Sequence, residues 1–181
     1  NAWYDSRFGR TSVGFDIRYE GIYSTKLGEP LDEKDWQSTQ GHDATSGINY
    51  TNQADRVNQS AFIEHDILLR DWTISLGLLA NHNTALDSRW RIYPGIDISY
   101  RPTQHWKLFA SWNMALRMPT FTDLYYSGTN IVGTKDLKPE KTNDVSLGTR
   151  YRTEGWKIEA SAFYSHKTDM IHWVIYADEP D

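Results

Sequence analysis

Acidic side chains gather between residues 26 and 53, the longest stretch of this sequence without a regular pattern. The members of this cluster are Glu29, Asp32, Glu33, Asp35 and Asp43. Carboxylate oxygens are the ligands that Ca²⁺ prefers, so Asp32, Glu33 and Asp35 form a candidate calcium site, the one cofactor that the sequence suggests. Their spacing is not that of an EF-hand, and a solvated acidic loop explains the same residues. We favour the solvated loop.

The sequence holds no pattern that is typical of an enzyme. Its six histidines are scattered, and no pair has metal-ligand spacing on one element. A Gly-x-Ser-x-Gly elbow and a glycine-rich phosphate loop are both absent. The lack of cysteine excludes a disulfide framework, a cysteine-ligated zinc site and a thiol nucleophile. The net charge of -5 argues against a nucleic-acid partner, which needs a basic face.

Apolar and polar side chains alternate along most of the chain, which is the pattern of half-buried strands. In residues 106–116, for example, Trp106, Leu108, Ala110, Trp112, Met114 and Leu116 share one face. Segments with the same alternation are 13–19, 61–69, 72–81, 90–100, 144–151 and 156–165. We therefore predict an all-β fold, an antiparallel meander of about seven long strands. Several reach roughly ten residues, the length that a tilted transmembrane strand needs.

The connections between these segments fall into two classes. Residues 70–71, 102–105 and 153–155 are short polar turns, whereas residues 26–53, 83–89 and 117–141 are long or irregular. The two classes alternate along the chain. Outer-membrane barrels have this arrangement, with short periplasmic turns and longer extracellular loops.

Aromatic residues recur beside the short turns. Trp72, Trp106 and Trp156 each begin a strand after such a turn, and Tyr100 and Tyr151 end strands at the same level. Such rings favour a membrane interface, because the ring body is buried while the polar tip stays wet. We predict one aromatic girdle at the periplasmic interface; three unrelated core tryptophans are the alternative.

The long connection after residue 116 carries a recognisable block. It reads Arg117-Met118-Pro119-Thr120-Phe121-Thr122-Asp123-Leu124-Tyr125-Tyr126 and continues to Leu137-Lys138-Pro139-Glu140. This resembles the "fRxPtf.eLY … G.pdLkPEks" block of TonB-dependent receptors, above all of the cobalamin and siderophore receptors. The next strand resembles the family's "ElGl.y" strand, with Val145 and Ser146 where the family usually has an acidic residue. Similarity extends over residues 72–173.

The resemblance implies an importer of the bacterial outer membrane, with a 22-stranded barrel closed by an N-terminal plug. Its partners would be outer-membrane lipid, a small nutrient ligand, and the TonB complex acting through the plug. We find no plug-like segment, TonB box or closing strand in the sequence. Residues 1–181 are therefore expected to be an internal piece of the barrel. Such a piece would self-associate through its unpaired edges and its apolar face.

Five residues of the long connections are candidate ligand contacts: Trp36, Tyr50, Arg117, Tyr125 and Tyr126. For Arg117 an architectural role is the stronger alternative, with Pro119 fixing the backbone and the guanidinium pairing with carboxylates. A second hypothesis for the whole chain is a soluble β-domain that binds carbohydrate or protein through surface aromatics.

Overall fold

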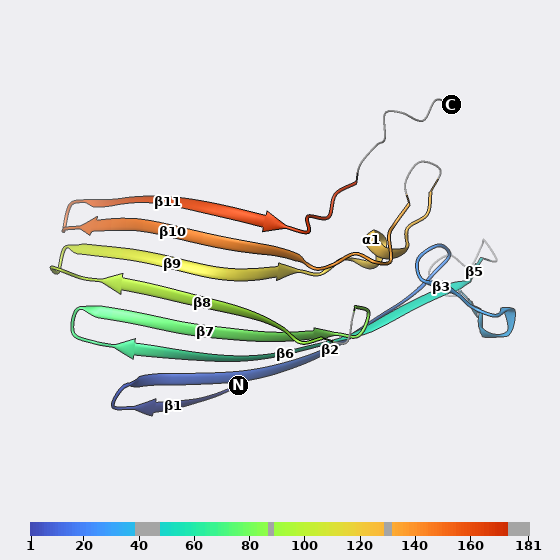
Figure 1. The fold of residues 1–181 in the computed structure, drawn as a ribbon, viewed down its shortest axis with the longest axis horizontal. Helices are drawn as coiled ribbons and strands as arrows, with labels where there is room; N and C mark the ends of the chain where they lie inside the picture. Colours follow the sequence, from blue (N-terminus) through green and yellow to red (C-terminus); the bar gives the residue numbers. More distant parts are fainter. Residues whose placement is uncertain (39–47, 87–88, 129–131, 174–181) are drawn as a thin grey trace, which may run out of the picture. The chain divides into compact units, whose positions relative to one another are not determined.

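The computed structural model describes residues 1–38, 48–86, 89–128 and 132–173. Its main element is an antiparallel sheet with the strand order β1-β2-β6-β7-β8-β9-β10-β11, so that neighbouring strands follow the chain (Figure 1). These strands are β1 (Ala2–Ser6), β2 (Gly9–Ser24), β6 (Asn52–Leu68), β7 (Trp72–Asn83), β8 (Arg91–Tyr100), β9 (Trp106–Arg117), β10 (Glu140–Arg152) and β11 (Lys157–Thr168). The predicted all-β meander and its seven long strands are confirmed.

The long connections contain short elements of their own. Strand β3 (Glu29–Pro30) pairs with β6, while β4 (Gln37–Ser38) and β5 (Asn49–Tyr50) form a separate two-stranded sheet. The helical turns are η1 (Glu33–Asp35) and α1 (Phe121–Tyr125). The chain divides into two compact units. The first comprises residues 1–18, 57–116 and 141–168, and the second comprises residues 19–56, 117–140 and 169–181. Among the described residues, no helix is long and apolar enough to cross a membrane.

Strand β1 was not predicted, because its five residues show no apolar alternation. It becomes a strand by pairing with β2, from Ala2 opposite Val13 to Ser6 opposite Gly9. Gly9 has a φ of 137°, and a Cβ there would lie 1.8 Å from the carbonyl oxygen of Asp66. Only glycine fits such a position, so this residue makes the tight return to β2 possible.

The cross-strand register keeps like side chains on one face of the first unit. Leu76 lies opposite Ile96, and Ile96 lies opposite Trp112. One residue along, Ser75 is opposite Asp97, which is opposite Ser111. Because a shift of one residue would exchange the two faces, this register separates an apolar face from a polar face across the sheet.

The apolar face is exposed. Leu76 and Leu78 keep 44% and 41% of their surface accessible, and Leu147 on β10 keeps 65%. In the described part of the chain, the buried hydrophobic residues are only Ala54, Tyr93 and Leu124. A soluble domain of this size would bury most of such side chains. The sheet is therefore a wall whose apolar side is left for another apolar medium or partner.

The short turns lie together at one end of the first unit (Figure 1), and the predicted aromatic residues stand beside them in the sequence. Trp72 stacks on Tyr100 with ring centroids 4.3 Å apart, and Trp106 contacts Tyr151 at 4.9 Å. Trp156 is 71% exposed beside its own turn. The structure thus brings four of the five residues of the predicted girdle together in two pairs, and their place at a membrane interface stays a prediction.

The register can be checked with engineered disulfides, because the chain has no cysteine of its own. Ala61 faces Ala80 across β6 and β7, whereas Leu79 points to the opposite face. We expect oxidation to crosslink the variant A61C/A80C and to leave A61C/L79C uncrosslinked, since a disulfide needs Cβ atoms roughly 4 Å apart. Non-reducing electrophoresis after cleavage of the chain between the two positions measures this. Efficient crosslinking of the second variant would contradict the register.

Candidate ligand site in the long connections

Arg117, the last residue of β9, joins both ends of the connection that follows it. Its Nη1 lies 3.3 Å from Oε2 of Glu140, the first residue of β10, and its Nη2 lies 3.7 Å from Oδ2 of Asp123 in α1. Both carboxylate side chains are only 9% exposed. A charged donor is what such buried acceptors need, so Arg117 acts as a clamp at the base of this connection.

The residues after Arg117 hold the short helix α1 in place. Thr120 is its N-cap: the Thr120 hydroxyl accepts a hydrogen bond from the Asp123 amide at 3.1 Å, and the Asp123 carboxylate accepts one from the Thr120 amide at 2.8 Å. This reciprocal capping box satisfies two backbone donors that the helix start would leave free. Pro119, Pro139 and Leu124 are buried around it. The block that resembles the receptor family is thus bonded to itself, which supports the architectural alternative for Arg117.

Arg56 of β6 is a further member of this arrangement that the sequence did not reveal. Its Nε lies 2.5 Å from Oε2 of Glu20, and its Nη1 donates to the carbonyl oxygen of Pro119 at 2.6 Å. The guanidinium also lies 4.7 Å from the centre of the Phe121 ring. The Arg56 side chain is only 12% exposed. It lies in a polar run with no periodic signal, so only the fold identifies it.

Beside α1 lies an open cavity of about 320 Å³ that Tyr125 helps to line, together with Glu29, Leu31, Gln53, Ala54 and Asp55. Lys135 contacts two of the lining residues: it donates to Oε1 of Glu29 at 2.6 Å, and its ammonium lies 5.6 Å from the centre of the Tyr125 ring. The hydrogen bond to Glu29 raises the pKa of Lys135. Because both partners are exposed, the ion pair adds little stability, and its groups stay available to a ligand.

The other predicted contacts do not line this cavity. Trp36 donates from Nε1 to the carbonyl oxygen of Leu31 at 3.2 Å, and Tyr50 pairs with Gln37 in the small sheet. Tyr126 packs edge-on against Trp173, with ring centroids 6.4 Å apart. Of the predicted contacts, the structure therefore places only Tyr125 at the cavity.

The acidic cluster does not converge in the described residues. Glu33 and Asp35 lie within η1, and Asp32 caps it without a side-chain bond; Asp32 instead lies 3.6 Å from Nζ of Lys34. Within residues 1–38, 48–86, 89–128 and 132–173, no group of three or more acidic or histidine side chains is placed to share a metal ion. Asp43 lies outside the described residues. Calcium binding stays a prediction.

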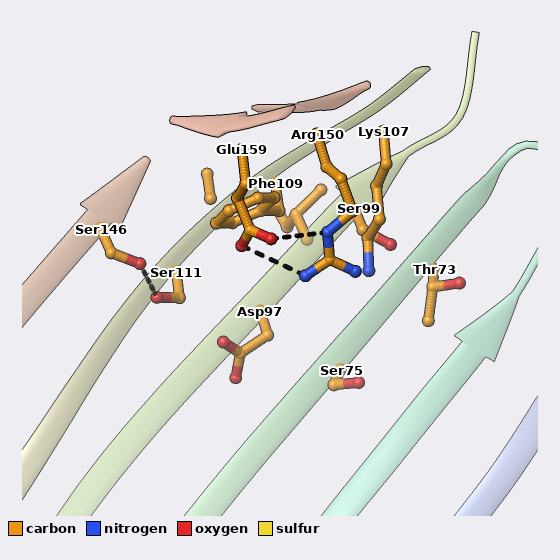
Figure 2. A pocket seen from close by; sticks show the side chains of 12 residues that line it. Thr73, Ser75, Asp97, Ser99, Lys107, Phe109, Ser111, Ser146, Arg150 and Glu159 are labelled. Atoms are coloured by element: carbon orange, nitrogen blue, oxygen red, sulfur yellow. Dashed lines mark hydrogen bonds and ion pairs between the residues drawn. The ribbon is translucent and has the colours of Figure 1, made fainter. Parts of the chain in front are cut away.

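The polar face of the first unit carries a second cavity, of about 440 Å³ (Figure 2). Figure 2 shows Asp97 between Ser75 and the pair Ser111 and Ser146, whose hydroxyls are hydrogen-bonded at 2.6 Å. Above it, Arg150 is bound to Glu159 through two hydrogen bonds, of 2.8 and 3.2 Å. These groups suit a polar partner and would be costly in contact with hydrocarbon, so this face and the apolar face require different surroundings.

Comparisons with known proteins find both similar sequences and similar folds. The family model "TonB dependent receptor-like, beta-barrel" matches residues 1–179. The vitamin B12 transporter BtuB of Vibrio vulnificus (strain YJ016) is 26% identical over 168 residues, which are 91% of this chain and 25% of that protein.

Solved receptor structures share the fold. The siderophore receptor PirA from Acinetobacter baumannii superposes with a TM-score of 0.71 at 16% identity, over 93% of this chain and 26% of that one. A mutant of the ferric enterobactin receptor (PfeA) from Pseudomonas aeruginosa, in complex with enterobactin, gives 0.64 at 18% identity, over 87% and 24%. The chain thus spans about a quarter of the length of these proteins.

The clamp can be tested with a double-mutant cycle on Arg117 and Glu140. We expect R117Q to lower the free energy of unfolding by about 1–3 kcal/mol, because it removes one charged donor that two buried carboxylates share. In the cycle R117Q, E140Q and R117Q/E140Q, the double variant should lose less than the sum of the single variants. Denaturant unfolding in detergent measures this, and strictly additive losses would show that the two side chains do not interact.

Proposed function

Because the chain belongs to the TonB-dependent receptor β-barrel family, we propose that it forms part of the wall and outer connections of a nutrient receptor in the bacterial outer membrane. The receptor takes up a scarce ligand, either a vitamin B12-like compound or a ferric siderophore, and the TonB complex supplies the energy. The support comes from the similar proteins, a vitamin B12 transporter and siderophore receptors. On this proposal the protein is not an enzyme.

The observation that carries the proposal is the register of the sheet. It keeps Leu76, Ile96 and Trp112 on one exposed face and Ser75, Asp97 and Ser111 on the other. A barrel wall has this construction, since its outer face meets lipid while its inner face meets a polar lumen. Lipid is therefore the proposed partner of the apolar face.

The alternative of a soluble β-domain has less support. Such a domain would need a second layer to cover the apolar face, and the described residues bury only three hydrophobic side chains. Membership of the receptor family also favours the barrel. Self-association of the isolated chain stays a prediction of the barrel hypothesis, because the apolar face and both sheet edges would then lack their neighbours.

Within the receptor, we propose the cavity beside α1 as a ligand contact. Tyr125 offers a ring face, and Lys135 and Glu29 offer exposed charges. Arg117 and Arg56 act as positioning residues, since their groups are engaged in holding α1. Contacts by Trp36, Tyr50 and Tyr126 remain predictions without a place at this cavity.

Uptake tests the proposal directly. The full-length protein that carries this chain would be expressed in a strain lacking its own cobalamin and enterobactin receptors. Growth on limiting cyanocobalamin or on ferric enterobactin should be restored, and only when TonB is present. Growth on neither ligand, with the barrel verified in the outer membrane, would contradict the proposed ligand classes.

The membrane orientation predicts losses of stability of unequal size for arginine at two adjacent residues of β9. Ala110 lies on the apolar face and Ser111 on the polar face. We expect A110R to lower the free energy of unfolding from lipid vesicles by about 2–4 kcal/mol, because an arginine near the bilayer midplane is costly. S111R, the matched control, should cost roughly 1 kcal/mol or less on the lumen side. Equal losses in the two variants would contradict the orientation.

The ligand contact predicts a loss of binding without a loss of fold. We expect Y125A to weaken binding of whichever ligand restores growth by about tenfold, which is the scale of one buried aromatic contact. Y23A is the matched control, because Tyr23 is exposed and does not line the cavity. Equilibrium binding to purified receptor measures both, and an unchanged dissociation constant for Y125A would remove Tyr125 from the site.

A further inference from the structure

The cavity beside α1 has an acidic edge. Glu29 and Asp55 line it with carboxylates, Gln53 adds a carboxamide, and none of the described residues that line it is basic. Strand β3 pairs with β6 so that Glu29 lies opposite Gln53. Asp55 follows Gln53 by two residues in β6. Because alternate residues of a strand share a face, these three polar side chains lie on the same side of the paired strands.

This acidic edge lies beyond the apolar face of the sheet. On the same side of β6, the residues are first Gln53, Asp55, Val57 and Gln59, and then Ala61 and Ile63. The apolar run thus begins only at Ala61, roughly 20 Å along the strand from Asp55. A carboxylate at the lipid face would be costly, whereas Asp55 is exposed outside that run. The cavity is therefore open to water and to a dissolved ligand.

The charges at the cavity do not cancel. Lys135 contacts the lining, but its ammonium is already engaged, 2.6 Å from Oε1 of Glu29. In the part of the chain that the structure describes, the Asp55 carboxylate forms no hydrogen bond or ion pair. With Glu29 and Lys135 neutralising each other, one negative charge is left over, on a carboxylate whose acceptor positions are free.

The second unit adds a field of the same sign. Its described residues include ten acidic and six basic side chains, whereas those of the first unit include nine acidic and thirteen basic ones. A surface of one sign repels an approaching ligand of that sign. An anion could bind the Lys135 ammonium only by displacing Glu29, which would leave it beside two carboxylates. The cavity thus disfavours an anion at contact and at longer range.

We propose that this cavity selects its ligand by charge: it takes an uncharged or cationic compound that donates hydrogen bonds to Asp55, and it excludes anions. Tyr125 and Leu31 supply apolar surface for the body of such a ligand. A vitamin B12-like compound meets this description, because its carboxamides donate hydrogen bonds and it carries no net negative charge. An iron chelate built on catecholates is an anion. The inference rests on the proposed function and narrows its ligand class.

The test measures equilibrium binding of cyanocobalamin and of ferric enterobactin to the full-length protein in detergent. D55N removes the charge at the cavity and keeps the size of the side chain. D35N is the matched control, because it removes the same charge from η1, which does not line the cavity. We expect the unsubstituted protein to bind cyanocobalamin at least about tenfold more tightly than ferric enterobactin.

The two variants should differ in their affinity for cyanocobalamin. D55N should weaken its binding by about fivefold to tenfold, because a hydrogen bond to a carboxylate is stronger than one to a neutral amide. D35N should stay within about twofold of the unsubstituted protein. Barrel formation, followed by the change in gel migration on heating, shows that each variant is folded.

Tighter binding of ferric enterobactin than of cyanocobalamin would overturn selection by charge and leave the proposed function standing. Equal losses in D55N and D35N, or no loss in either, would remove Asp55 from the site and overturn the inference in the same way. A folded barrel that binds neither compound would contradict the proposed function itself, and the inference with it.

Discussion

The structure depends on one constraint, the two-residue period of side chains held in register across paired strands. Because Leu76, Ile96 and Trp112 stand opposite one another, the apolar face is continuous over three strands. The same pairing makes Ser75, Asp97 and Ser111 a polar row on the other face. Backbone hydrogen bonds satisfy the peptide groups in between, which is what a wall exposed to lipid requires.

The long connection after β9 depends on a different kind of interaction. In this connection, ion pairs and side-chain hydrogen bonds hold the chain where paired strands would use backbone hydrogen bonds. Arg117 forms ion pairs with Asp123 and Glu140, and Arg56 donates to the carbonyl oxygen of Pro119. Bonds of this kind fix α1 without a large apolar core. They leave Tyr125 at an open cavity, so that the proposed ligand contact lies on a segment that ion pairs and hydrogen bonds hold in place.

The sequence was sufficient to predict the long strands of the sheet, but it predicted less of the connections between them. Alternation predicted each long strand, because the period of two reports directly on which face is apolar. It missed β1, whose strand form comes from pairing with β2, and it missed Arg56, whose partners are distant in the sequence. Tyr125 was predicted from the family-like block, but its cavity depends on Glu29 and Asp55, which only folding brings near.

The central claim is that one face of the sheet contacts lipid and the other does not. Since the chain has no cysteine, single nitroxide labels can be placed at successive positions of β9, residues 107–116, in the full-length protein in vesicles. Accessibility to oxygen, which partitions into lipid, should then rise and fall with a period of two. It should be high at Leu108, Ala110 and Trp112 and low between them. A constant accessibility along β9, or maxima at Ser111 and Asn113, would contradict the account.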